Sequence, residues 1–116
     1  MNAEKSQMGQ IRIALAQINP TVGDLVSNSE LVLKNAKDAA QSGAVVVVYP
    51  EMVLTGYPIE DLALRSTFIQ ASRNALVDLA KEIAENGMGE ILTLVGYLFA
   101  TNREAIGDFT TGPVAF

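Results

Sequence analysis

Three short apolar runs alternate with two longer amphipathic stretches along this chain. The runs at residues 11–18, 44–49 and 91–95 are rich in isoleucine, leucine and valine, which is typical of β-strands. The stretches at residues 24–42 and 66–86 repeat apolar side chains at the three- and four-residue spacing of an α-helix. This β-α-β-α-β order predicts an α/β protein with parallel strands.

Both predicted helices have end signals and an apolar face. Asp24 is the expected N-cap of the first helix, and Gly43 is placed to end it. Two glycines follow the second helix. We expect the polar Asn28 and Asn35 of the first helix to face solvent. The apolar faces consist of Leu25, Val32, Ala36, Ala39 and Ala40 in the first helix and of Phe68, Ala71, Ala75, Leu79 and Ile83 in the second.

The predicted strands are expected to be covered on both faces. In the first strand, large side chains such as Ile13 and Leu15 alternate with small alanines, so both faces are apolar. Residues 44–49 are apolar throughout, as in a central strand. Three strands are few for such a sheet, and we expect the chain to hold only part of a domain.

The two ends of the chain carry weaker signals. Residues 1–10 are polar and lack the apolar segment of a secretory signal, so we expect a flexible N-terminal arm. Residues 101–108 predict a polar loop, and residues 109–116 predict part of an edge strand. No apolar run approaches the roughly 20 residues of a membrane span. We expect a cytoplasmic protein without a membrane partner.

The composition excludes several kinds of chemistry. The 116 residues contain no histidine and no cysteine, which removes a Ser-His-Asp triad, a thiol nucleophile and the usual ligands of structural zinc from this chain. The chain has 8 basic and 13 acidic side chains, for a net charge of −5, and the basic ones are scattered. We therefore expect no nucleic-acid partner and no metal site.

Candidate chemistry lies where the predicted strands end, because ligands of open α/β sheets bind at the carboxyl ends of the strands. Glu51 comes directly after the second strand and Pro50. We expect its carboxylate to be partly removed from water, which suits a general base, although a solvated loop acid is the alternative. Tyr57 lies on the loop that follows and is either a pocket wall or a packing aromatic.

Two other interpretations are weaker. Glu60 and Asp61 could hold a metal ion, but the helix dipole favours acidic residues at the start of a short helical segment. A receiver-like signalling domain shares the βαβ pattern and an acid at a strand end. It needs an acidic pair directly after its first strand, where this chain has Asn19 and Pro20.

Two segments resemble the start of a nitrilase-superfamily (carbon-nitrogen hydrolase) domain. They are Ile-Arg-Ile-Ala-Leu-Ala-Gln-Ile-Asn-Pro-Thr-Val-Gly-Asp-Leu at residues 11–25 and Val-Val-Val-Val-Tyr-Pro-Glu-Met-Val-Leu-Thr-Gly-Tyr-Pro at residues 45–58. More narrowly, Gly-Tyr-Pro-Ile-Glu-Asp-Leu-Ala-Leu-Arg at residues 56–65 is similar to the N-terminal glutaminase domain of glutamine-dependent NAD+ synthetases. The resemblance covers residues 11–97.

This resemblance implies a fold, a reaction and partners. The fold is an α-β-β-α sandwich, of which residues 11–116 would form the N-terminal part. A Glu-Lys-Cys triad acts on glutamine, with Glu51 as general base toward the thiol, and Tyr57 lies near the substrate. The family also has a separate C-terminal synthetase domain, which uses ATP and Mg2+ to form NAD+, and its members are homo-oligomers.

The sequence also departs from the family pattern. It has no cysteine, no lysine in the catalytic context and no Ser-Gly-Gly pyrophosphate loop. We therefore expect an incomplete glutaminase domain without cofactors of its own. It should be inactive by itself and should expose a strand edge and a sheet face, through which it associates or loses solubility. The alternatives are another nitrilase-family amidase and a non-catalytic binding module derived from one.

Overall fold

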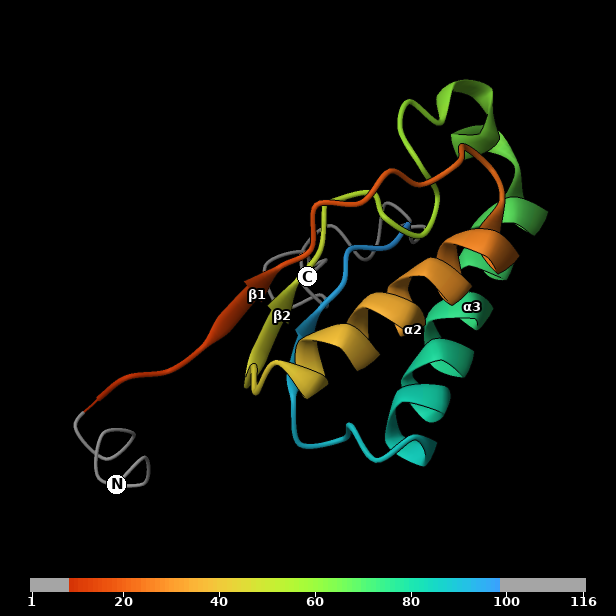
Figure 1. The fold of residues 1–116 in the computed structure, drawn as a ribbon. Helices are drawn as coiled ribbons and strands as arrows, with labels where there is room; N and C mark the ends of the chain where they lie inside the picture. The colour runs from red at the N-terminus through yellow and green to blue at the C-terminus, as the bar shows by residue number, and fades with distance from the viewer. Residues whose placement is uncertain (1–8, 99–116) are drawn as a thin grey trace, which may run out of the picture.

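A computed structural model describes residues 9–98, which form a three-stranded sheet with two α-helices beside it (Figure 1). The elements are β1 (Ile13–Leu15), α2 (Leu25–Gln41), β2 (Val46–Val48), the 3₁₀ helix η1 (Glu60–Leu64), α3 (Ser66–Glu85) and β3 (Leu92–Leu94). The strand order is β1-β2-β3, and both pairs are parallel. The predicted α/β order is confirmed, although the strands are shorter than predicted.

Three expectations fall mainly or wholly on parts of the chain outside the described residues. They are the N-terminal arm at residues 1–10, the loop at 101–108 and the edge strand at 109–116. In the part of the chain that is described, neither helix is both long enough and apolar enough to cross a membrane.

The ends of α2 lie where the sequence predicts them. The Asp24 side chain caps the first turn by accepting a backbone hydrogen bond of 3.1 Å. At the other end, the N–H of Gly43 donates to the carbonyl of Ala40, and the N–H of Ala44 donates to the carbonyl of Ala39. These are the paired bonds of a Schellman motif, and Gly43 has the positive φ, +83°, that such a motif requires.

Both helices lie on the same side of the sheet (Figure 1). The core between these layers includes Val32 and Ala36 of α2, Val47 of β2 and Leu79 and Ile83 of α3. The predicted apolar face of α2 is largely confirmed. The predicted face of α3 is wrong at Ala71, which is exposed, whereas its neighbour Ser72 is fully buried.

The opposite side of the sheet carries a second apolar surface. We call it the open face; the strand register places Ile13, Val46 and Leu92 in one row and Leu15, Val48 and Leu94 in the next. Ile13, Leu15 and Leu92 are 50%, 70% and 58% exposed. The expectation that the first strand is covered on both faces is therefore wrong for the described residues, because both helices pack on its alanine side.

Tyr49 ties the sheet to α2, and this contact predicts a dependence of stability on pH. Its buried hydroxyl donates a 2.8 Å hydrogen bond to the carbonyl of Val32, and burial raises the pKa of the Tyr49 phenol from 10.0 to about 12. Because the folded state favours the neutral phenol, its contribution to stability is complete below pH 10 and is lost as the pH rises toward 12.

Tyr49→Phe should therefore lower the free energy of unfolding at pH 8 by about 0.5–1.5 kcal/mol, the usual net value of one hydrogen bond. The difference between the two proteins should shrink between pH 10 and pH 12, as followed by urea unfolding. Tyr57→Phe is the matched control, because Tyr57 is 77% exposed and should leave stability unchanged. A difference that stays constant with pH would contradict this account.

Candidate active site

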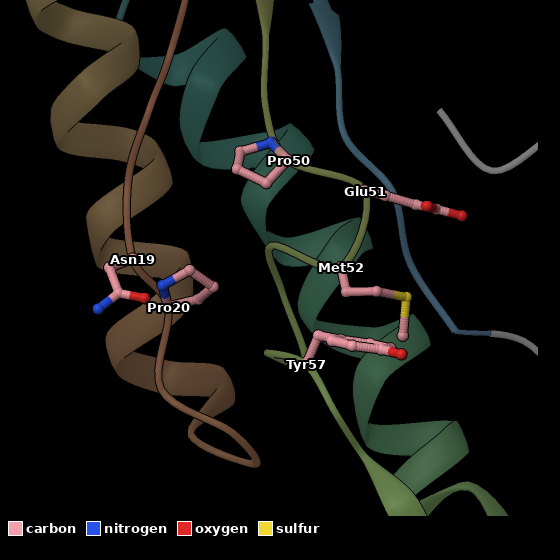
Figure 2. A pocket seen from close by; sticks show the side chains of 6 residues that line it. All are labelled: Asn19, Pro20, Pro50, Glu51, Met52 and Tyr57. Carbon is pink, nitrogen blue, oxygen red and sulfur yellow. The ribbon is translucent and has the colours of Figure 1, made fainter.

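A pocket of about 450 Å³ opens where β1 and β2 end (Figure 2). Its walls come from two loops, the first after β1 and the second after β2. The lining residues are Asn19, Pro20, Pro50, Glu51, Met52 and Tyr57. The pocket therefore lies at the sheet edge where the sequence predicts chemistry, and it brings together both predicted site residues, Glu51 and Tyr57.

The Glu51 side chain extends from the turn that follows Pro50. Figure 2 shows it pointing away from Asn19 and Pro20, toward the side of the pocket on which β3 ends. The expectation of a partly desolvated carboxylate is wrong for the described residues, because Glu51 is exposed. The carboxylate is thus accessible to a group that approaches from the β3 side.

The backbone of Glu51 rests against Gly96, the second residue after β3. A methyl group in place of one Gly96 hydrogen would overlap the carbonyl oxygen of Glu51. Only glycine allows the two backbones to come this close. The position of Glu51 is consequently fixed by two neighbouring strands, β2 through the chain itself and β3 through Gly96.

Tyr57 forms the outer wall of the pocket. Its ring is 77% exposed and lies beside the side chain of Met52 in Figure 2. Met52 is half-buried, and together the two side chains give this side of the pocket an apolar surface. This position suits a residue that contacts a bound ligand, and a substrate-binding role for Tyr57 stays a prediction.

The part of the second loop between Glu51 and Tyr57 is buried, which the sequence does not predict. Val53, Leu54, Thr55 and Gly56 are all inaccessible. Buried loop backbone needs hydrogen-bond partners. One of them comes from Asn28, whose Nδ2 donates to the carbonyl of Leu54 at 2.8 Å.

The expectation that both asparagines of α2 face solvent is wrong for Asn28, which is 1% exposed. Its hydrogen-bond partners lie 7 and 26 residues away in the sequence, so no local pattern indicates the burial. Asn35 is half-buried, and its side chain donates to the carbonyl of Leu31 within the same helix.

The acidic pair Glu60 and Asp61 lies at the start of η1, as the dipole argument predicts. Both side chains are exposed, and a carboxylate oxygen of Asp61 is 4.0 Å from the Arg65 guanidinium. Across residues 9–98, no three His, Cys, Asp or Glu side chains come together as metal ligands. The position of Glu60 and Asp61 is thus the one that the helix dipole favours, in the first turn of η1.

Comparison with known sequences places most of the chain in one family. Residues 12–107 match the model of a family described as carbon-nitrogen hydrolase. The glutamine-dependent NAD+ synthetase of Thermotoga maritima is 35% identical over 91 residues, which are 78% of this chain and 15% of that protein.

Comparison of structures agrees with this result. The glutamine-dependent NAD+ synthetase from Acinetobacter baumannii matches with a TM-score of 0.64 and 26% identity, over 81% of this chain and 16% of that chain. An amidase from Nesterenkonia sp. matches with a TM-score of 0.53 and 27% identity, over 62% of this chain and 28% of that chain. This chain thus matches only 15–16% of the length of the two synthetases and 28% of the length of the amidase.

Proposed function

Because the chain belongs to the carbon-nitrogen hydrolase family, we propose that it is the N-terminal part of the glutaminase domain of a glutamine-dependent NAD+ synthetase. The nitrilase-like α/β fold predicted from the sequence is confirmed for this part. The observation that carries the proposal is the placement of Glu51, directly after Pro50 at the end of β2, in the wall of a pocket of about 450 Å³. The whole protein would release ammonia from glutamine and use it to make NAD+.

In this proposal Glu51 acts as the general base. Its carboxylate takes the proton of a cysteine thiol, and the sulfur attacks the side-chain amide carbon of glutamine. Glu51 then gives that proton to the amide nitrogen, which leaves as ammonia when the thioester forms. Water, deprotonated by Glu51, hydrolyses the thioester to glutamate, and the proton returns to the cysteine sulfur. A lysine and backbone N–H groups stabilise the oxyanion formed at each attack. The sequence has no cysteine, so the thiol must be supplied from outside these 116 residues.

The synthetase half of the reaction would use other residues. The described residues contain no cluster of three metal-ligating side chains. By the resemblance to the synthetases we assign Mg2+ and ATP to another part of the protein, since the sequence has no Ser-Gly-Gly pyrophosphate loop. We propose that a separate C-terminal domain binds both and uses the ammonia to convert nicotinic acid adenine dinucleotide into NAD+. We further propose that the whole protein is a cytoplasmic homo-oligomer.

Another amidase of the same family is the second candidate, because the Nesterenkonia amidase shares this part of the fold. The similarity of residues 56–65 to the synthetases favours the first candidate. A coding region that continues past Phe116 into a lysine, a cysteine and a synthetase domain would support it further. A natural chain that ends without them would favour a non-catalytic binding module.

A chimera tests the proposal. In this chimera, residues 11–97 of the present chain replace the matching segment of the Thermotoga maritima synthetase. We expect the chimera to form NAD+ with glutamine as the nitrogen source, because its own cysteine and lysine complete the site around Glu51. The 116-residue chain alone should release no ammonia from glutamine, since it has no thiol. Coupled assays of ammonia and NAD+ measure both.

The nitrogen source provides the control for this experiment. A chimera that forms NAD+ from ammonium chloride has a folded synthetase domain, so loss of the glutamine reaction alone would then reject the proposal. Turnover of glutamine by the isolated chain would show that a nucleophile other than cysteine operates, and would reject the mechanism given above.

A further inference from the structure

The pocket lies between two loops that are distant in the sequence. The first loop, residues 16–24, carries Pro20, and the second loop, residues 49–59, carries Met52 and Tyr57. The width of the pocket therefore depends on how the backbones of these two loops are held relative to each other.

Asn28 of α2 forms hydrogen bonds to both loops. Its Oδ1 accepts from the backbone N–H of Thr21 at 2.8 Å, and its Nδ2 donates to the carbonyl of Thr21 at 2.8 Å. The second Nδ2 hydrogen is donated to the carbonyl of Leu54, also at 2.8 Å. The Asn28 side chain is 1% exposed and Leu54 is fully buried, so losing the donor to Leu54 would leave a buried carbonyl unpaired. The carbonyl of Thr21 also accepts from the backbone N–H of Asp24.

The two loops also touch directly at Gly56. A methyl group on Gly56 would lie 2.6 Å from the Cα of Val22, and Gly56 has a φ of +76°. Beside this contact, the N–H of Gly23 donates to the carbonyl of Thr55 at 2.8 Å. The loop backbones are thus packed against each other without an intervening side chain, and Asn28 bonds to both of them next to this contact.

We propose that Asn28 is a positioning residue for the pocket. By joining Thr21 to Leu54, it sets the distance of Pro20 from Met52 and Tyr57, and so the width of the space in which the substrate amide would lie. Asn28 does not line the pocket itself. That the substrate is an amide such as glutamine rests on the proposed function. The hydrogen bonds by which Asn28 joins the two loops are independent of the substrate.

Asn28→Asp tests this role in the 116-residue chain. The aspartate keeps the shape and the acceptor oxygen but has no N–H for the two carbonyls. With methionine methyl groups labelled with ¹³C, the Met52 signal reports on the pocket and the Met88 signal on the core, where Met88 is 5% exposed. We expect Asn28→Asp to shift the Met52 signal and leave the Met88 signal in place. Asn35→Asp, in the same helix, should shift neither, since Asn35 donates only one turn back, to Leu31.

A second measurement needs no substitution. The amide hydrogen of Thr21 lies in an exposed loop residue, and its bond to Asn28 should slow its exchange about tenfold or more relative to an unstructured peptide. An unprotected Thr21 amide overturns the proposal, as does a folded Asn28→Asp chain whose Met52 signal is unchanged. Neither readout involves glutamine, so a chimera that cannot use glutamine would reject the proposed function and leave this inference standing.

Discussion

Glu51→Gln in the chimera should abolish glutamine-driven NAD+ formation while ammonia-driven formation continues. The glutamine side chain has nearly the same shape as glutamate but cannot take a proton from the thiol, so the nucleophile stays protonated. Loss of general-base catalysis typically costs a factor of roughly 10²–10⁴ in rate. The ratio of the glutamine-driven to the ammonia-driven rate in one preparation measures the effect directly.

Glu60→Gln is the matched control for this experiment. Glu60 is an exposed acid nine residues further along, in η1, and it does not line the pocket. Its substitution should leave both rates unchanged. Loss of the ammonia-driven reaction in Glu51→Gln, or an equal loss of the glutamine reaction in Glu60→Gln, would count against a base at Glu51.

The 116-residue chain should associate with itself through the open face, and Leu15→Lys should largely prevent this. Leu15 is 70% exposed and lies in a row with Val48 and Leu94. Burying one leucine contributes about 1.5–3 kcal/mol. Replacing it by lysine should therefore weaken association roughly 10- to 150-fold. Sedimentation velocity over a range of concentrations gives the mass of the associated species and of the variant.

Leu64→Lys distinguishes this surface from apolar exposure in general. Leu64 is even more exposed, at 86%, but it belongs to η1 and not to the sheet. We expect this variant to associate like the unmodified chain. Two results would show that the open face does not drive association. The unmodified chain could stay monomeric at every concentration, or the two lysine substitutions could weaken association equally.

The order of the elements and the two ends of α2 could be predicted because their causes are local. The Asp24 cap and the Gly43 stop depend on residues within one or two turns of α2. That Glu51 follows the end of a strand could be predicted from the strand before it and from Pro50, which are adjacent in the sequence. Such features need no knowledge of how distant segments pack.

The errors arise where packing between distant segments decides the outcome. A shift by one position in a helix rotates the buried face by about 100°, and the small side chains of Ala71 and Ser72 gave no signal strong enough to choose between them. Asn28 is polar, so its burial depends on partners in two loops that the helix pattern does not contain. The coverage of β1 depends on where the helices lie, and alternating apolar residues cannot specify that.

The contact between Gly96 and Glu51 affects the conformational entropy of the candidate base. Fixing the backbone of one residue costs about 1–2 kcal/mol at 25 °C. At Glu51 this entropy is lost when β2 and β3 come together during folding, before any substrate is present. Binding then has only the side-chain torsions of the carboxylate left to order, so a larger share of the binding free energy remains for the substrate itself.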